Sequence, residues 1–179
     1  MGSILEALSP EQQIACSTQN NILLTACPGS GKTRTLTHRL AYQVLRDPAS
    51  KKIKIAITYT NRAAEEITNR LEGMNIDQSS IWAGTIHQFC MHFIIRPYAM
   101  YSKRLCKGYR IIDDYSKKAY GREIAERLGM HLNYYDDPFQ YENVRTEYKR
   151  VLKEKKEIDF DAILLISEEL LASCAFIGS

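Results

Sequence analysis

The chain has 179 residues, of which 45% are hydrophobic, 25% charged and 9% aromatic, and this composition excludes disordered and fibrous classes. Lys and Arg number 24 against 21 Asp and Glu, so the formal net charge of +3 indicates no particular partner. The apolar runs are only a few residues long, far short of the roughly 20 that cross a bilayer, so the sequence does not predict a membrane protein.

The cysteines are scattered and odd in number, with no Cys-x-x-Cys pair, and no secretory signal opens the chain. These features predict a reducing, cytoplasmic setting. The length allows one compact domain, or one domain that carries an insertion. The five cysteines are Cys16, Cys27, Cys90, Cys106 and Cys174.

The first predicted elements are a strand and a helix on either side of a glycine-rich turn. Residues 21–26 are an apolar run without a helical period, and Pro28 and Gly29 follow them. This pattern predicts a buried strand that runs into a turn. From Thr33 onward apolar residues recur at helical spacing as far as Asp47, which predicts a helix.

The same scheme follows twice more along the chain. Isoleucines alternate with other residues over 53–57, and Thr60 or Asn61 can cap a helix that ends near Gly73. Residues 81–84 predict a third strand, which leads into a helix that stops near Pro97. Strand followed by helix, three times over, predicts the α/β class with a parallel sheet flanked by helices.

The texture of the sequence changes after residue 98. Residues 99–158 hold fourteen Lys and Arg, ten Asp and Glu and eight of the eleven tyrosines, with few strand signals. We predict a first part of a core domain over 1–98, a mainly helical insertion over 99–158 and a helix over 159–179 that returns to the core. The positive excess of the insertion indicates either a duplex-facing surface or a solvated helix face.

Between the first strand and the first long helix lies a phosphate-binding loop pattern, which departs from its usual form only at its first position, where Ala replaces Gly. Glycines let main-chain N–H groups turn toward phosphate oxygens at a helix N-terminus. Lys32 is expected to reach the β- and γ-phosphates and the Thr33 hydroxyl to ligate Mg²⁺. The alternative is a chance glycine turn. The pattern comprises Ala26, Cys27, Pro28, Gly29, Ser30, Gly31, Lys32 and Thr33.

Three more segments occur in order around this loop, at residues 8–15, 58–64 and 83–89. They resemble the Q motif, motif Ia and motif Ib of the UvrD/Rep-type superfamily 1 DNA helicases. The similarity covers residues 8–96 well, and 109–120 and 158–171 more loosely. It implies a RecA-like P-loop NTPase fold, ATP and Mg²⁺ as cofactors, and single-stranded DNA and single/double-strand junctions as partners.

The resemblance assigns nucleotide contacts to two residues beyond the loop. Gln12 is similar to the glutamine that reads the adenine edge, since one amide can both donate and accept. Its alternative role is that of a solvated residue near a helix start. Arg34 is expected beside the base or the phosphates.

The resemblance also assigns a set of DNA contacts. Tyr59 stands where the family more often has Phe and where a base stacks; the alternative is a core aromatic residue at a strand end. The hydroxyl and amide groups of this set would touch the single-strand backbone, although each could also cap a helix. Arg62 keeps a positive charge, and His87 is either a nucleic-acid or subdomain contact or a residue satisfied by the backbone. The set is Tyr59, Thr60, Asn61, Arg62, Thr85 and His87.

Hydrolysis needs a carboxylate pair after a buried strand. Asp113 and Asp114 supply one superficially, but only two apolar residues precede them, and the family has a similar segment at the start of its inserted subdomain. In the family the catalytic pair comes beyond the segment matched here by residues 159–161. We therefore expect an incomplete motor core, with the remaining motor domains of the same chain as partners and little activity in this fragment.

The sequence thus predicts the N-terminal ATP-binding and single-stranded-DNA-contacting domain of an ATP-dependent DNA helicase, which is an ATP hydrolase. One alternative is the motor part of a helicase-nuclease recombination subunit. Another, from a different class, is a P-loop small-molecule kinase, although the segments around Tyr59 and Thr85 have no reason to recur there. A nucleotide-dependent binding module without catalysis is a third.

Overall fold

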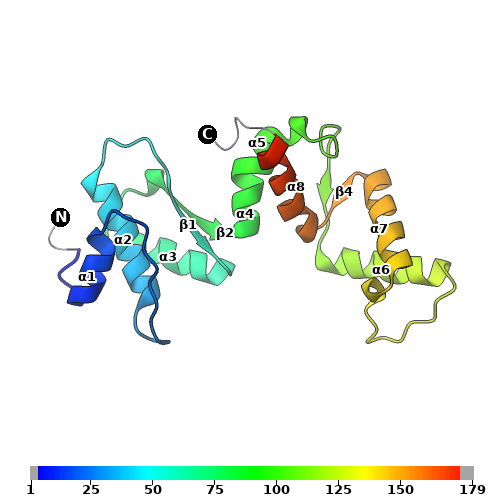
Figure 1. Ribbon diagram of the computed structural model, residues 1–179, viewed down its shortest axis with the longest axis horizontal. Helices are drawn as coiled ribbons and strands as arrows, with labels where there is room; N and C mark the ends of the chain where they lie inside the picture. The colour runs from blue at the N-terminus through cyan, green and yellow to red at the C-terminus, as the bar shows by residue number, and fades with distance from the viewer. Residues whose placement is uncertain (1–3, 174–179) are drawn as a thin grey trace. The chain divides into compact units, whose positions relative to one another are not determined.

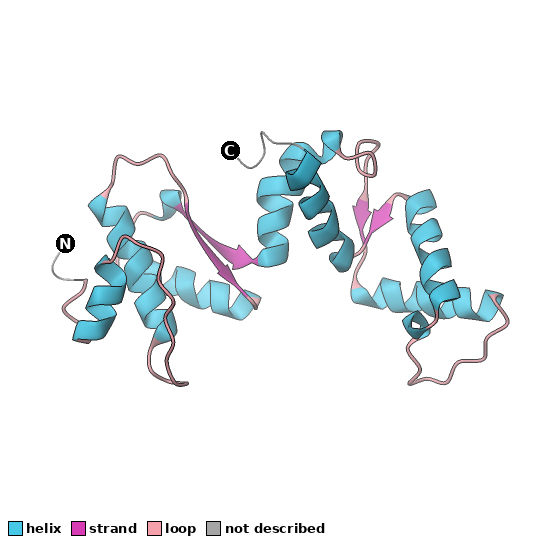
Figure 2. Ribbon diagram, in the orientation of Figure 1, coloured by secondary structure: helices cyan, strands magenta, loops and turns pink. Residues whose placement is uncertain are grey.

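The structure is a computed structural model that describes residues 4–173. The chain divides into two compact units, one on either side of the boundary between Ile86 and His87. Figure 1 shows the order of the elements along the chain, and Figure 2 shows that helices outnumber strands in both units. The described residues therefore form a mixed α/β structure that is mostly helical, with small parallel sheets.

The first unit contains one parallel strand pair and its helices. The strands β1 and β2 pair in parallel, with Ile55 opposite Trp82 and Thr58 opposite Thr85. The predicted parallel arrangement is thus confirmed for two of its three strands. The elements are α1 (Pro10–Ser17), α2 (Lys32–Arg46), β1 (Lys54–Thr58), α3 (Asn61–Gly73), the 3₁₀ helix η1 (Gln78–Ser80) and β2 (Ile81–Thr85).

The core of this unit lies on one face of the strand pair. Ala56 of β1 is 3% exposed and packs with apolar residues of α2 and α3. Ile55 and Ile57 point to the other face and remain 39% and 47% exposed. Parallel strands are normally covered on both faces, so the described residues cover only half of this sheet. The core residues are Leu40, Ala41, Val44, Ala56, Ile67, Leu71 and Ile76.

The strand predicted over residues 21–26 is not formed. The segment has no regular secondary structure, and Leu23 is 89% exposed. A strand requires a neighbour whose main-chain groups complete its hydrogen bonds. Among residues 4–173 the only partner of β1 is β2, and no described strand pairs with residues 21–26. The prediction of a buried strand is therefore wrong for the described structure, in which this apolar run has no ladder to join.

The second unit begins with a helix that changes its winding. Residues of α4 are followed by a π-helix, where the N–H of Arg96 bonds to the carbonyl of Met91. Pro97 has no N–H and cannot make the α-helical bond to the carbonyl of Phe93. The i to i−5 bonding of the π-helix therefore ends next to the position where α-helical bonding would be interrupted. The elements here are α4 (Ile86–Phe89), the π-helix η2 (Cys90–Ile95), α5 (Arg96–Tyr98) and the 3₁₀ helix η3 (Ala99–Tyr101).

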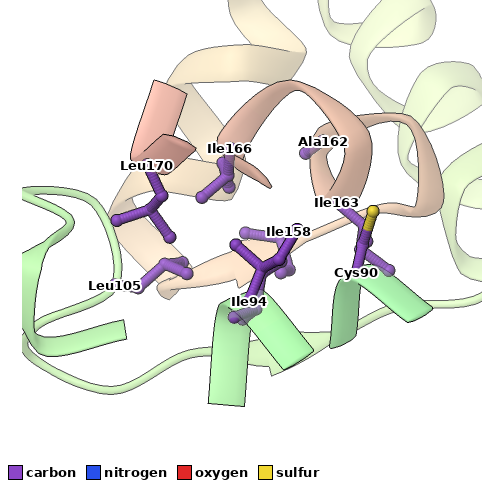
Figure 3. Packing of buried hydrophobic residues seen from close by; sticks show 9 residues of the cluster. Cys90, Ile94, Leu105, Ile158, Ala162, Ile163, Ile166 and Leu170 are labelled. Atoms are coloured by element: carbon purple, nitrogen blue, oxygen red, sulfur yellow. The ribbon is translucent and has the colours of Figure 1, made fainter. Parts of the chain in front are cut away.

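The last described helix, α8 (Phe160–Ser173), packs against this π-helix. Ile163 and Ile166 of α8 are at most 1% exposed, and they meet Cys90 and Ile94 from the π-helix. Figure 3 shows these side chains converging around Ile158. Burial of these apolar side chains joins sequence positions some 70 residues apart, at about 25 cal/mol per Å² of area removed from water.

The rest of the second unit is a helical subdomain with its own core. Val144, Tyr148 and Leu152 on one face of α7 are buried against Ile124 and Ala125 of α6. This agrees with the predicted helical character of residues 99–158, to which the structure adds a parallel pair between β3 and β4. The elements are β3 (Arg110–Ile111), α6 (Asp114–Arg127), the 3₁₀ helix η4 (Pro138–Gln140), α7 (Glu142–Lys155) and β4 (Glu157–Ile158).

A buried polar cluster connects α6, α7 and α8. The Tyr148 hydroxyl donates to Oδ2 of Asp159 at 3.0 Å, and Oδ1 of Asp159 accepts the N–H of Ala162 at 2.9 Å. Lys117 of α6 lies 3.6 Å from Oδ2 of Asp159 and 2.6 Å from Oδ2 of the exposed Asp161. Burial, followed by the charge of Asp159, raises the pKa of the Tyr148 phenol. Because buried polar groups are costly unless paired, this cluster fixes how the three helices meet.

Candidate functional site

The predicted phosphate loop turns through two glycines just before the helix α2. Gly29 and Gly31 adopt positive φ angles of 80° and 86°, the left-handed region that side chains disfavour. Gly31 is the N-cap of α2 and offers no side chain to it. The first N–H groups of a helix have no acceptor within the helix, so the start of this 15-residue helix presents donors and a positive dipole end.

Lys32 arches back over the loop. Its ammonium nitrogen donates to the carbonyls of Ala26 at 2.7 Å and Cys27 at 2.8 Å, in an exposed setting. Both acceptors are neutral carbonyls, so the ammonium of Lys32 keeps its charge without an opposite charge in these two bonds. Thr33 lies in the same first turn and is partly buried.

Gln12 contacts the loop from the first helix. Its Nε2 donates to the carbonyl of Ser30 at 3.1 Å, and its Oε1 accepts the N–H of Ser9 at 3.1 Å. The second bond belongs to a capping box in which the Ser9 hydroxyl accepts the N–H of Gln12. A Cβ on Gly31 would lie 3.2 Å from Nε2 of Gln12. The structure therefore gives this side chain a mechanical link to the loop, which the Ser-x-x-Gln spacing of a capping box could have indicated.

Two arginines of α2 fasten the first helix to the second. Arg34 donates to the carbonyl of Ala7 at 2.8 Å, and Arg39 donates to the carbonyls of Ala15 and Asn20. The guanidinium of Arg34 is thus bonded to the segment just before α1, the helix that carries Gln12, and not to the glycine loop. In this structure Arg34 supports the position of α1. Arg39 was not singled out from the sequence, because nothing in its spacing marks it.

The predicted DNA contacts of the first unit gather where the parallel strands end. Thr58 and Thr85 are opposite each other in the register of β1 and β2, so Tyr59 and Thr85 share the carboxyl edge of the strand pair. Tyr59 is 98% exposed, which rules out the alternative that it is a core aromatic residue. A solvent-facing ring at this edge is available for stacking.

The residues after Tyr59 open the helix α3. Thr60 is its N-cap, with a hydroxyl that accepts the N–H of Ala63 at 3.2 Å. Its carbonyl accepts the hydroxyl of Thr58 at 2.9 Å. Asn61 and Arg62 are exposed in the first turn. The capping alternative for Thr60 is therefore confirmed, and the exposed neighbours present an amide and a guanidinium to solvent.

His87 lies in the second unit, two residues beyond Thr85. Its ring packs edge-on against Phe160 of α8, with the ring centroids 5.7 Å apart at 80°. This contact anchors the start of α4 to α8.

The acidic pair at 113–114 has a structural role. Asp113 is the N-cap of α6, and its Oδ1 accepts the N–H of Ser116 at 2.8 Å. That bond lowers the pKa of the Asp113 carboxyl.

Over residues 4–173, neither a cluster of three or more potential metal ligands nor a helix able to span a membrane is found.

Comparison with known proteins identifies the relatives of this chain. The model of the UvrD/REP helicase N-terminal domain matches residues 8–137. The ATP-dependent DNA helicase PcrA of Staphylococcus aureus is 39% identical over 98 residues, and PcrA of Bacillus subtilis is 40% identical over 95. These matches cover 54% and 52% of this chain and 13% of each relative.

A longer match links the chain to PcrA of Leuconostoc citreum, at 27% identity over 187 residues, covering 88% of this chain and 25% of that protein. The chain therefore spans a quarter or less of the length of these relatives. Since the family match extends over more than half of the sequence, including the glycine loop and the strand edge, the chain belongs to the UvrD/REP helicase N-terminal domain family.

Proposed function

We propose that this chain is the N-terminal ATP-binding and single-stranded-DNA-contacting domain of an ATP-dependent DNA helicase. The observation that carries the proposal is the loop itself. Two left-handed glycines precede a helix whose N-cap has no side chain, and Lys32 lies across the turn. This arrangement suits a polyanionic ligand, and the relatives are described as ATP-dependent.

The residues present fit a magnesium nucleotide. Lys32 would hold the β- and γ-phosphates, the loop N–H groups would cradle them, and the Thr33 hydroxyl would ligate Mg²⁺. Gln12 and Arg34 would border the base side of the site while keeping the loop attached to α1. When bound, ATP supplies the free energy that the complete motor uses to move.

We further propose that the strand edge grips single-stranded DNA. Tyr59 would stack on a base, while Thr60, Asn61 and Thr85 would contact the sugar-phosphate backbone. Arg62 would add a positive charge, and His87 would contact DNA or brace the start of α4. The exposure of Tyr59 supports this role, as does the description of the relatives as DNA helicases.

The same proposal assigns the fold to the RecA-like class. The parallel pair β1 and β2, covered by helices on one face, suits a fragment of such a core. Residues 1–98 would be its first part, 99–158 an inserted helical subdomain and 159–179 a return to the core; residues 1–3 and 174–179 of these ranges lie outside the described residues. Further motor domains would complete the sheet and the catalytic site.

Replacement of Lys32 tests the nucleotide site. Lys32→Ala should abolish binding of a fluorescent ATP analogue, because the variant loses the ammonium that meets the phosphates. Lys51→Ala is the matched control, since Lys51 is exposed in the loop before β1 and should keep wild-type affinity. Thermal unfolding followed by circular dichroism checks that both variants fold. Wild-type affinity in a folded Lys32→Ala protein would contradict the proposal.

A further inference from the structure

Two neighbouring tyrosines project from the loop that joins α6 to η4. Tyr134 and Tyr135 are 82% and 93% exposed, and their ring centroids lie 5.3 Å apart at 88°. Large aromatic side chains normally bury most of their surface. A pair left almost wholly in solvent, with one ring standing on edge against the other, therefore needs an explanation.

The loop is built to hold this pair in place. Arg122 of α6 donates to three main-chain carbonyls of the loop, those of Asn133, Tyr134 and Asp136. Its guanidinium carbon also lies 5.7 Å from the centroid of the Tyr134 ring. Oδ2 of Asp136 accepts the N–H of Asn133 at 2.7 Å and closes the turn. The tyrosines thus stand on a turn that one arginine and one carboxylate tie together.

Both ends of the loop are anchored in the core of the helical subdomain. Met130 and Leu132 pack against that core on one side of the tyrosines, and Phe139 does so on the other. The ring of Phe139 sits so close to Gly121 that an added Cβ would lie 2.9 Å from it. The anchors use apolar side chains for burial, while the two tyrosines are left outside.

The surroundings of the pair fit a flat aromatic ligand better than a protein. Polar residues precede and follow the pair in the chain, at Asn133, Asp136 and Asp137, so the aromatic stretch is only two residues long. A stable protein interface needs a larger apolar patch. The carboxylates of Asp136 and Asp137 accept the N–H groups of Asn133 and of Phe139 in η4, while Arg122 donates to carbonyls of the loop and Arg145 to the carbonyl of Phe139. A ligand of this loop would therefore be recognised mainly through the faces of the tyrosine rings, and little through the net charge of the surrounding side chains.

We propose that Tyr134 and Tyr135 form a stacking platform in which one ring offers its face to a nucleobase and the other, at 88° to it, supports it from the side; the base would come from an unpaired strand or the open end of a duplex. The inference rests on the proposed function, which makes DNA the partner of this chain. It adds a base contact in the helical subdomain, separate in sequence from the strand edge at Tyr59. The Arg122 guanidinium beneath Tyr134 contributes a cation–π contact that stiffens the platform.

The test uses the 179-residue chain with its tyrosine rings labelled with ¹³C, titrated with a single-stranded oligonucleotide and, separately, with a blunt duplex. The ring signals of Tyr134 and Tyr135, assigned through Phe variants, should shift with at least one of the two. A shift with only one shows which source supplies the base. The Tyr134→Ala/Tyr135→Ala variant should bind that DNA about 5- to 150-fold more weakly, the range that corresponds to the loss of one stacked base.

Two controls sharpen the result. Tyr134→Phe/Tyr135→Phe keeps the ring faces and should retain affinity within about twofold, while Tyr115→Ala removes another tyrosine that is 82% exposed and should have no effect. Unmoved Tyr134 and Tyr135 rings overturn the proposal, and if the Tyr59 ring shifts in the same titration the proposed function survives that failure. Rings that respond to protein concentration and not to DNA would assign the pair to self-association and overturn the platform.

Discussion

Gln12 is the residue whose structural contacts bear most on function. One amide group completes the cap of α1 and also bonds to the carbonyl of Ser30 within the glycine loop. Its Nε2 also borders the space that a side chain at Gly31 would fill. In the proposed nucleotide site, a base that contacts this amide would act on the loop directly through the bond to Ser30, and recognition of the base and of the phosphates would be mechanically connected.

Replacement of Gln12 tests this connection against a matched neighbour. Gln12→Ala should lower the free energy of unfolding by about 1 kcal/mol and weaken binding of a fluorescent ATP analogue. Gln13→Ala removes a bond of the same kind, to the carbonyl of Leu8 at 3.0 Å, without touching the loop. It should cost similar stability and leave affinity unchanged. Equal losses of affinity in both variants would show that α1 acts only through its stability.

Single-residue roles could be predicted from the sequence where the signal is local. Thr60 as a cap and the glycines as turn formers depend on nearby backbone geometry, and both predictions are confirmed. The contact of Arg34 with Ala7 spans 27 residues, and that of Arg122 with its loop spans 11 to 14. Such bonds depend on how helices pack, which no local pattern specifies.

At the scale of elements, α6 shows how one carboxylate sets a helix start. Asp113 caps the helix, whereas Asp114 is its first residue. The N–H of Ser116 is the largest cause of the lowered pKa of Asp113. A carboxyl with a lowered folded pKa stabilises the protein above its unfolded pKa, near 3.9, and this contribution is lost as pH falls through the folded value.

Asp113→Ala should therefore destabilise the protein at pH 7, and the difference from wild type should shrink as the pH falls below about 3.9. Urea unfolding at a series of pH values measures it. Asp114→Ala serves as the control, because it removes the adjacent carboxylate and keeps the cap. If the destabilisation by Asp113→Ala is the same at every pH, the cap does not depend on the charge of the carboxylate.

Helices and strands whose apolar residues recur at helical or strand spacing could be predicted from the sequence. Elements that form only against a distant partner could not. The helices α2 and α3 and the strands β1 and β2 follow apolar patterns and their caps, and lie close to the predicted bounds. Residues 21–26 have a strand composition but no described neighbour to pair with. The π-helix of residues 90–95 was also missed, since the sequence marks only where Pro97 stops a helix.

At the scale of the whole molecule, the features proposed to bind nucleotide and DNA are divided between the two units. The first unit holds the glycine loop and the strand edge, and the second holds the helical subdomain with the exposed Tyr134 and Tyr135. The first unit also leaves Ile55 and Ile57 of β1 partly exposed. The chain spans at most a quarter of the length of the relatives that it matches.

The central claim is that main-chain N–H groups at the start of α2 bind a nucleoside triphosphate. The most direct measurement follows the amide signals of a ¹⁵N-labelled chain while ATP with Mg²⁺ is added, with AMP as the matched ligand that lacks the β- and γ-phosphates. The account predicts that Gly29, Gly31, Lys32 and Thr33 shift most, and far more with ATP than with AMP. Amides that stay unmoved at saturating ATP, or that respond equally to AMP, would contradict it.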